Sequence, residues 1–338
     1  MISKTCFIIA ELSANHGGKL DVALETVKAA KRSGADAIKI QTYTADTITL
    51  NSRKEVFKIK QGTHWDGQFL YDLYNEASLP WEWHKPIFDL AEELDLVCFS
   101  SPFDFSAVDL LEELNTPIYK IASFEITDIP LIEYTARKGK PMIISTGIAE
   151  IQDIELAIET CRRVGNNDIT ILKCTSAYPA DPADANLMTI PDIKDRFGVK
   201  AGLSDHTMGI EGPVVATVLG ATVIEKHFIL DKSIGGPDAH FSLDEKEFTE
   251  MVKAVRMAEQ MMGRAEYDMT EKKKKSRQFS RSLFVVKDVK AGETITHDNV
   301  RSIRPGFGMH PKHLSEIVGK TFEQDLEKGT PLSFEMIK

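Results

Sequence analysis

The feature that most constrains the fold is a pattern that recurs eight times along the chain. Each repeat has a short apolar run rich in β-branched residues, then a loop with a polar residue, then an amphipathic stretch. The apolar runs are 6–11, 35–41, 96–101, 117–123, 141–146, 169–175, 199–204 and 222–227. Helical periodicity lies between most of them, at 20–32, 83–94, 107–114, 153–163 and 211–219. Strands that alternate with helices pair in parallel through right-handed crossovers, so this pattern predicts an α/β fold.

We predict that the eight units close into a (β/α)8 TIM barrel, with an open doubly wound sheet as the alternative architecture. The first run is not followed by the GxGxxG fingerprint of a dinucleotide-binding sheet. Polar residues recur at the C-terminal end of nearly every run. In a parallel barrel these ends form one rim, which is where the active sites of barrel enzymes lie.

Residues 1–265 form the predicted barrel domain, and a smaller unit follows it. Residues 266–281 are polar and lack apolar periodicity, so we expect a linker there. Residues 282–338 contain short strand patterns with the turn signals KAGE and EKGT. A unit this small is only marginally stable alone, so we expect it to pack on something larger.

Composition limits the classes of partner. The formal charge of −10 leaves no basic surface for nucleic acid, and the run Lys272–Lys275 is short enough to be a solvated part of the linker. The N-terminal apolar run is too short for a signal peptide or a membrane span. The four cysteines lack CxxC spacing and are interpreted as small core residues in a reducing compartment, which predicts a cytoplasmic protein.

The rim of the predicted barrel is rich in charged and hydroxyl side chains. Two lysines, Lys39 and Lys120, lie inside apolar runs, where an ammonium group without a partner is costly. With several nearby serines they indicate a cradle for a phosphate or a carboxylate, the alternative being ion pairs with barrel carboxylates. The rim residues are Glu11, Lys39, Gln41, Ser101, Lys120, Ser123, Glu125, Ser145, Thr146, Ser176, Tyr178, Ser204, His206, Glu225 and His227.

Two of the nine histidines, His206 and His227, end neighbouring runs within GLSDHT and IEKHF. Neutral imidazoles at the ends of adjacent strands suit two cis positions on a divalent ion and leave open positions for water and substrate oxygens. No HExxH or cysteine-rich pattern reinforces this, so hydrogen-bonded core histidines remain the alternative.

A series of motifs in fixed order resembles the sialic acid synthase family along the whole chain. The motifs are AELSANHGG, KIQTY, SSPFD, YKIASFE, ISTGI, CTSAYPA, GLSDHT, EKHF and GPDAHFS. Residues 282–338, with IRPGFG at 303–308, resemble the antifreeze-like (SAF) domain that follows the barrel in those synthases. Within the family, ELSANHGG and Ser176 resemble the branch that makes pseudaminic acid, with the N-acetylneuraminic and legionaminic acid synthases as the alternative branches.

The resemblance implies a transferase that condenses phosphoenolpyruvate with the open-chain aldehyde of an N-acetylated amino sugar and releases phosphate. For the pseudaminic branch that sugar is 2,4-diacetamido-2,4,6-trideoxy-L-altrose. The resemblance also implies a Mn²⁺ or Mg²⁺ ion held by His206 and His227, with Asp205 and Glu225 as candidates to orient the imidazoles. It implies phosphoenolpyruvate binding by Lys39, Ser101, Lys120, Ser123, Ser145, Ser176 and Ser204.

The remaining roles that the resemblance implies concern catalysis, the sugar and assembly. Glu125 is expected to be the general acid/base, its alternative being an ion pair with Lys120. Glu11 completes the expected catalytic set and faces the sugar with Gln41, Tyr178 and Asp238. Arg304, in the RPG turn, is expected to reach the other subunit's active site in a domain-swapped homodimer.

Two rival functions and one loop stay open at this point. An aldolase could use Lys120 or Lys226 as a Schiff-base nucleophile, and a non-catalytic sugar-binding protein could keep the fold without the reaction. The long loop 43–67 carries His64, Trp65 and Asp66, which are candidates for sugar contacts or for anchors of a lid.

Overall fold

The structure is a computed structural model that describes residues 5–60, 62 and 65–338. His64, a candidate of the long loop, lies outside the described residues. The chain divides into two compact units, Met1–Gly263 and Arg264–Lys338, and each is described by itself. No helix in the described part of the chain is long and apolar enough to cross a membrane.

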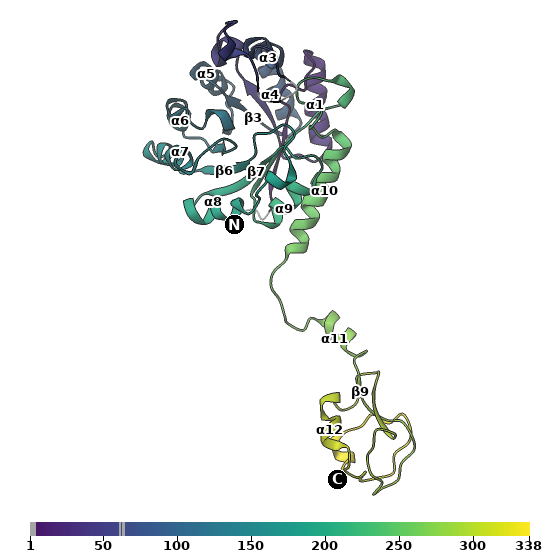
Figure 1. The fold of residues 1–338 in the computed structure, drawn as a ribbon. Helices are drawn as coiled ribbons and strands as arrows, with labels where there is room; N and C mark the ends of the chain where they lie inside the picture. The colour runs from purple at the N-terminus through teal and green to yellow at the C-terminus, as the bar shows by residue number, and fades with distance from the viewer. Residues whose placement is uncertain (1–4, 61, 63–64) are drawn as a thin grey trace. The chain divides into compact units, whose positions relative to one another are not determined.

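The first unit is a closed barrel of eight parallel strands in sequential order, with helices around it (Figure 1). This confirms the predicted TIM barrel, and an observed strand lies within or overlaps each of the eight predicted runs. The ring closes where β1 pairs with β8, with Glu11 opposite His227. The strands are β1 (Phe7–Glu11), β2 (Ala37–Thr42), β3 (Val97–Pro102), β4 (Tyr119–Ile121), β5 (Met142–Ser145), β6 (Ile169–Cys174), β7 (Lys200–Asp205) and β8 (Val223–His227).

The helices that cover the barrel bury apolar stripes against the outward-facing side chains of the strands. They are α1 (Leu20–Arg32), α4 (His84–Glu93), α5 (Phe105–Glu113), α6 (Ile129–Ala136), α7 (Ile151–Arg163), α8 (Thr189–Phe197), α9 (Glu211–Val218) and α10 (Glu245–Met262). The predicted helical stretches did not include α6 and α8, although α5 and α9, which are equally short, were predicted.

The barrel interior has an apolar lower layer and a polar upper layer. Successive side chains of a strand point to opposite faces, so residues two apart share the interior. The lower layer is formed by Ile9, Ala37, Phe99, Ile143, Leu172 and Val223. Two positions further along the same strands come Glu11, Lys39, Ser101, Ser145, Cys174 and Glu225, all of them buried. The two-residue period therefore places the polar set together at the C-terminal mouth of the barrel.

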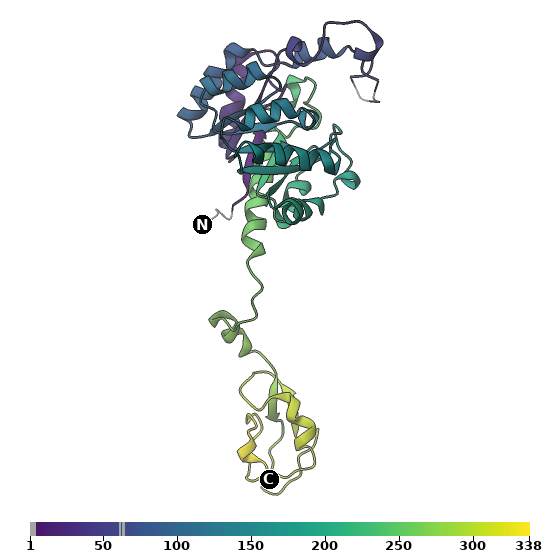
Figure 2. The ribbon, with the colours of Figure 1, turned by 90° about the vertical axis from the view of Figure 1, so that its left-hand side faces the viewer.

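The long segment between β2 and α4 gathers at this end of the barrel, as Figures 1 and 2 both show for α3 (Leu70–Ala77). It also contains the short helix α2 (Ala45–Ile48). The Trp65 ring lies 6.2 Å from the Tyr178 ring, centroid to centroid, which brings the end of the long loop to the mouth.

The second unit has its own small apolar core, centred on Leu283, Val285 and Phe322. Strand β9 (Ser282–Val285) pairs antiparallel with β10 (Val300–Ile303), and α12 (Leu314–Ile317) packs beside them. The RPG turn after β10 is tied down by Ser282, whose Oγ donates to the Pro305 carbonyl at 2.7 Å and accepts from the Gly308 amide at 2.9 Å. Arg304 is exposed on this turn. The expected linker contains an exposed helix, α11 (Glu271–Arg277), which carries Lys272–Lys275.

Candidate active site

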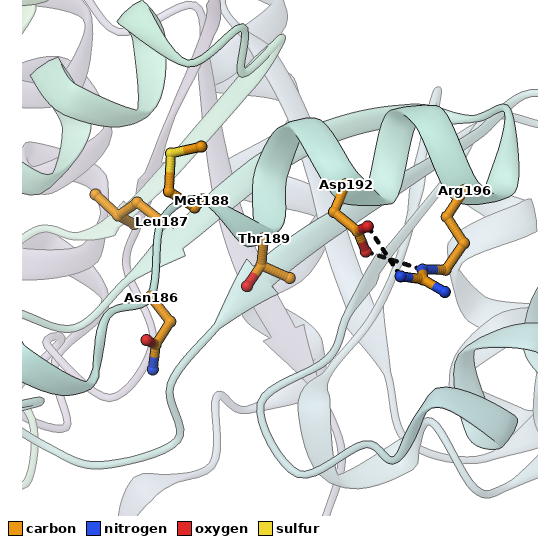
Figure 3. A pocket seen from close by; sticks show the side chains of 6 residues that line it. All are labelled: Asn186, Leu187, Met188, Thr189, Asp192 and Arg196. Carbon is orange, nitrogen blue, oxygen red and sulfur yellow. Dashed lines mark hydrogen bonds and ion pairs between the residues drawn. The ribbon is translucent and has the colours of Figure 1, made fainter.

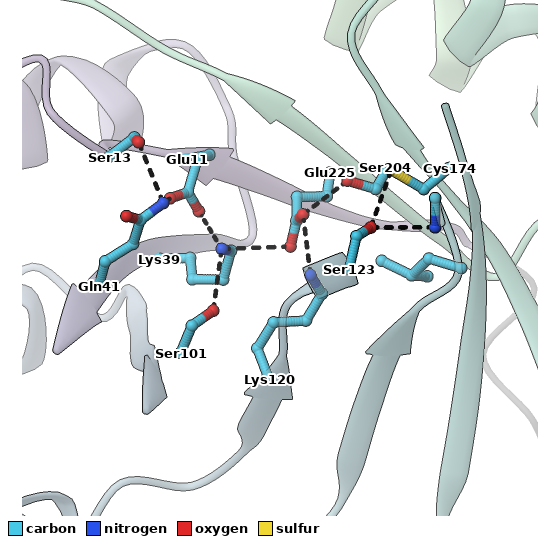
Figure 4. A network of polar contacts seen from close by, with 12 residues as sticks. Glu11, Ser13, Lys39, Gln41, Ser101, Lys120, Ser123, Cys174, Ser204 and Glu225 are labelled. Carbon is cyan, nitrogen blue, oxygen red and sulfur yellow. Dashed lines mark hydrogen bonds and ion pairs between the residues drawn. The ribbon is translucent and has the colours of Figure 1, made fainter. Parts of the chain in front are cut away.

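Lys39 lies at the centre of the polar layer, between two carboxylates from β1 and β8 (Figure 4). Its Nζ forms a short ion pair with Glu11 and lies 3.7 Å from Oε2 of Glu225. It also donates to Oγ of Ser101 at 3.3 Å. Lys39 is 3% exposed, so these partners replace water around its charge.

Glu225 links Lys39 to Lys120 on β4 and to Ser204 on β7. Its Oε1 accepts from Nζ of Lys120 at 3.3 Å and from Oγ of Ser204 at 2.8 Å. The buried layer thus holds two lysines and two carboxylates from four strands. Lys39 and Lys120 therefore form ion pairs with barrel carboxylates, which was the alternative to a cradle for a phosphate or a carboxylate.

The two carboxylates differ in proton affinity because they differ in lysine contacts. Burial raises the pKa of Glu11 above its ordinary value, although Lys39 opposes this. Burial would also raise the pKa of Glu225, but Lys120 and Lys39 together hold it below its ordinary value. Glu11 is therefore the carboxylate that takes a proton first, and a proton there leaves the layer with a surplus positive charge.

The hydroxyl groups of Ser123 and Ser176 and the thiol of Cys174 lie close around Gly147. Its amide donates to Oγ of Ser123 at 3.0 Å. A methyl group added at Gly147 would lie 2.0 Å from Oγ of Ser176 and 2.8 Å from Oγ of Ser123, so only glycine fits. Oγ of Ser145, on β5, is buried and makes no hydrogen bond within the described part of the chain. Buried hydroxyl groups near the lysine layer, one of them without a partner, are suited to binding an anion.

His206 and His227 come together at the ends of β7 and β8, with ring centroids 5.3 Å apart. Nδ1 of His206 lies 2.9 Å from the Thr175 carbonyl, which leaves Nε2 without its proton if the ring is neutral. Nδ1 of His227 makes no hydrogen bond to any residue that the structure describes. Burial, His206 and the nearby lysines lower the pKa of His227 well below its ordinary value, so its ring stays neutral.

Neutral imidazole is the form that binds metal, and His227 is held in that form. Burial lowers the pKa of His206, but Cys174 and the Thr175 carbonyl outweigh it and raise that pKa, so an ion would displace a proton from His206. Nδ1 of His227 is a buried nitrogen without a hydrogen-bond partner among the described residues, which an ion would satisfy. The residues described here contain no group of three or more His, Cys, Asp or Glu side chains arranged to hold a metal ion. An ion on the two imidazoles would therefore take its other ligands from water or substrate.

Glu125 lies just beyond β4, in the turn Ser123–Glu125. Its Oε2 is buried and has no hydrogen-bond partner among the residues described. Burial raises the pKa of Glu125 from 4.5 to about 7, although Lys120 opposes the shift. Lys120 forms its ion pair with Glu225, so the alternative pairing with Glu125 is not formed. A carboxyl group that titrates near neutrality is suited to proton transfer.

The residues expected at the sugar lie around the same mouth. Gln41 donates to Glu11 and to Ser13, both at 3.0 Å. The Tyr178 ring lies 4.4 Å from the His206 ring, centroid to centroid. Asp238 lies with its Oδ2 3.6 Å from Nδ1 of His227. The barrel mouth thus gathers these three residues with the histidines, whereas Arg304 belongs to the second unit.

Two acidic residues near the histidines pair with lysines, and no hydrogen bond or ion pair given for them in the described part of the chain goes to an imidazole. Asp205 pairs with Lys226 on the opposite face of the strands, toward the helices. Glu225 pairs with the two lysines, and none of its contacts given for the described residues goes to an imidazole. Lys226 is 1% exposed and already paired, so it is not available as a Schiff-base nucleophile.

Cys174 is a site residue that the sequence analysis placed in the core. All four cysteines are buried and unpaired, but Sγ of Cys174 accepts from Ser123 at 3.3 Å and lies 3.8 Å from Nδ1 of His206. Ser13 and Gly147 also lie in the site, and neither was predicted as a site residue. The two-residue period was a usable signal for Cys174, because Leu172 is an interior residue of the same strand.

A surface cavity of about 380 Å³ against α8 lies apart from the mouth (Figure 3). Its charged lining is the i,i+4 ion pair of Asp192 and Arg196, in which both side chains are about half exposed. Exposed, mutually satisfied charges offer little to a ligand. We therefore place the site at the barrel mouth, where buried polar groups are unmet.

Comparison with known families supplies the decisive observation. The model of the NeuB family matches residues 26–267, which is most of the chain, and the SAF domain model matches residues 280–338. The chain belongs to the NeuB family. The NeuB match covers most of the barrel that holds the site, and the SAF match covers the unit that carries Arg304.

The NeuB chain is similar to named relatives over nearly its whole length. It is 51% identical to the pseudaminic acid synthase of Helicobacter pylori, over 98% of this chain and 97% of the relative. It is 38% identical to the N,N'-diacetyllegionaminic acid synthase of Legionella pneumophila, over 99% of this chain and 96% of the relative. The crystal structure of N-acetylneuraminic acid synthetase from Leptospira borgpetersenii is 30% identical, with a TM-score of 0.72 over 80% of this chain and 90% of that one.

Proposed function

We propose that this chain is a pseudaminic acid synthase that acts in the cytoplasm. It condenses phosphoenolpyruvate with the open-chain form of 2,4-diacetamido-2,4,6-trideoxy-L-altrose, giving pseudaminic acid and phosphate. The observation that carries the proposal is the 51% identity to the Helicobacter pylori pseudaminic acid synthase over 98% of the chain. The identity to the legionaminic acid synthase is lower, at 38%. Four unpaired cysteines are consistent with a reducing compartment.

Phosphoenolpyruvate binds over the polar layer. Lys39 and Lys120 supply positive charge, and a proton on Glu11 frees part of that charge for the incoming phosphate and carboxylate. Hydroxyl groups complete the cradle from Ser101, Ser123, Ser145, Ser176 and Ser204. The unmet Oγ of Ser145 and the close approach of the Ser123 and Ser176 hydroxyls to Gly147 support this placement.

His206 and His227 hold the divalent ion, Mn²⁺ or Mg²⁺. When bound, the ion supplies positive charge that polarises the aldehyde oxygen of the sugar. The residues of the chain do the rest: Thr175 fixes the tautomer of His206, and burial keeps His227 neutral.

Glu125 moves the proton. The enol carbon of phosphoenolpyruvate attacks the aldehyde carbon, and the aldehyde oxygen takes the proton of Glu125 and becomes a hydroxyl. Water then adds to the oxocarbenium carbon, and one of its protons returns to the Glu125 carboxylate. The bond from that carbon to the phosphate oxygen breaks, phosphate leaves with the proton of the new hydroxyl, and the carbon becomes the ketone of the 2-keto acid. The pKa of about 7 supports this assignment, because each protonation state of Glu125 is accessible near neutral pH.

Glu11, Gln41, Tyr178 and Asp238 bind the sugar. Glu11 and Gln41 are already joined at the mouth, and Gln41 also contacts Ser13. Amide and carboxyl groups are suited to the hydroxyl and acetamido groups of this substrate.

Phosphate release from phosphoenolpyruvate with Mn²⁺ tests the function. The altrose sugar is compared with N-acetylmannosamine and with its 2,4-diacetamido-6-deoxy relative. We expect turnover with the altrose sugar alone. Turnover only with another sugar would keep the mechanism and overturn the branch, and no release with any sugar would overturn the synthase.

A domain-swapped homodimer completes the proposal, with Arg304 of one chain contacting the sugar in the barrel of the other. Arg304 is exposed on a turn that Ser282 holds in place. Mixing Arg304→Ala and Glu125→Gln chains tests this, because only a swapped heterodimer rebuilds an intact site. We expect the refolded mixture to recover about a quarter of wild-type activity, since half of the dimers gain one of two sites. Activity no higher than that of the variants alone would contradict the swap.

A further inference from the structure

The residues directly before the two histidines form an ion pair of their own. The sequences SDH and EKH place Asp205 before His206 and Lys226 before His227. Neighbouring side chains of a strand face opposite sides, so these residues point toward the helices while the histidines stand at the mouth. Asp205 and Lys226 are also direct partners in the β7–β8 register.

The hydrogen bonds of this pair are short, and both side chains are buried from solvent. Nζ of Lys226 donates to Oδ2 of Asp205 at 2.5 Å and to the Thr207 carbonyl at 2.6 Å. The other oxygen, Oδ1 of Asp205, accepts from the amide of Thr207 at 3.1 Å and from its Oγ1 at 2.8 Å. The two side chains are 3% and 0% exposed. The two bonds from Lys226 join β8 to the end of β7, and the two bonds between Asp205 and Thr207 hold the β7 segment on either side of His206.

The covering helix leaves no room for this group to rearrange. Gly212, at the start of α9, lies so close that an added methyl would meet Oδ1 of Asp205 at 3.1 Å and Oγ1 of Thr207 at 3.2 Å. The backbone beyond His206 is held as well, because its carbonyl accepts from the Ala180 amide at 2.9 Å. The ion pair is therefore clamped between the sheet and a helix.

We propose that the Asp205–Lys226 pair positions His206 and His227 for the divalent ion from behind the sheet. A buried ion pair contributes little net stability, because desolvation offsets most of its attraction. It does fix geometry, since a slip between β7 and β8 would leave two buried charges without partners. The pair thus sets the distance and register of the two imidazoles without touching the ion. The inference rests on the metal site of the proposed function.

Mn²⁺ affinity of the purified full-length chain tests the proposal, read from the electron paramagnetic resonance signal of free Mn²⁺. We expect the Kd for Mn²⁺ to rise by at least about tenfold in Asp205→Asn and in Lys226→Met, as for other residues that orient metal ligands. Asp36→Asn is the matched control, because Asp36 pairs with Arg256 at 2.7 Å at the opposite end of the barrel. The control should bind Mn²⁺ as the wild type does.

The double variant Asp205→Leu/Lys226→Met separates positioning from stability. Removing both charges should restore much of the unfolding temperature that either single change loses. We expect its Mn²⁺ affinity to stay at least about tenfold weaker, because the bonds across β7 and β8 are absent. Wild-type affinity in the single or double variants would overturn the proposal, as would equal weakening in Asp36→Asn.

The experiments distinguish an error in the proposed function from an error in this inference. A wild-type chain that binds Mn²⁺ through His206 and His227 but releases no phosphate would overturn the synthase and leave the positioning role in place. A wild-type chain that binds no Mn²⁺ would overturn the metal site and the positioning role together.

Discussion

The lower and upper halves of the barrel interior are built by the same strands, two residues apart, yet they differ in almost every property. The lower half is filled by apolar side chains such as Ile143 and Leu172. The upper half holds buried charges, and several of its polar atoms have no partner in the described chain, among them Ser145 Oγ and Glu125 Oε2. Each unmet buried group costs about 1–3 kcal/mol. The lower half therefore stabilises the fold, and the upper half is kept for a ligand.

The largest effect expected from the upper half comes from Glu125→Gln. The amide keeps the shape of the side chain but delivers no proton, so kcat should fall by about 1,000-fold. The KM for phosphoenolpyruvate should change little, because Glu125 is not part of the phosphate cradle. Steady-state phosphate release measures both constants. A loss of less than tenfold would remove Glu125 from the acid/base role.

Gly147→Ala should act next most strongly, on binding. The added methyl would lie 2.0 Å from Oγ of Ser176 and 2.8 Å from Oγ of Ser123, so both hydroxyls must move out of the cradle. At about 2–3 kcal/mol of lost contacts, the KM for phosphoenolpyruvate should rise about 30- to 140-fold. Circular dichroism at the assay temperature checks that the variant is folded. An unchanged KM would place phosphoenolpyruvate elsewhere.

Glu125 also makes the stability of the barrel depend on pH. Its pKa rises from 4.5 to about 7 on folding, so between these values the folded chain holds more protons than the unfolded chain. Its contribution to stability is complete below pH 4.5 and is lost as the pH rises through 7. At pH 8, Glu125→Gln should therefore be more stable than wild type by about 1–3 kcal/mol in urea unfolding, and the difference should vanish near pH 4. A difference independent of pH would contradict this account.

The smallest effect, and the one that tests the lower half, is Ile143→Val. Loss of one buried methylene should lower the free energy of unfolding by about 1 kcal/mol. Both kcat and the KM for phosphoenolpyruvate should stay at wild-type values, although Ser145 lies on the same strand. A change in KM comparable to that of Gly147→Ala would show that the two halves are not independent.

Much of this architecture was predictable because the period of a strand is strict. The apolar runs gave the strands, and their polar ends gave the mouth residues. It was harder to predict whether a strand residue faces the barrel interior or the helices. That prediction requires one residue of the strand whose interior position is already known. Cys174 looked like a core residue until Leu172 placed it inside the barrel. Asp205 and Lys226 lay beside the histidines in sequence but face the helices, because adjacent residues alternate.

The closure of β1 on β8 has a consequence for how the enzyme comes into being. Lys39 meets Glu11 from the neighbouring first strand, but its second carboxylate, Glu225, belongs to the last strand. A chain emerging from the ribosome in N-to-C order can hold Lys39 with its early partner long before the later one is synthesised. Only when the eighth strand seals the ring do Lys120, Glu225 and His227 arrive at the same place. A nascent or truncated chain that lacks β8 has an incomplete site, so we expect it to have no activity.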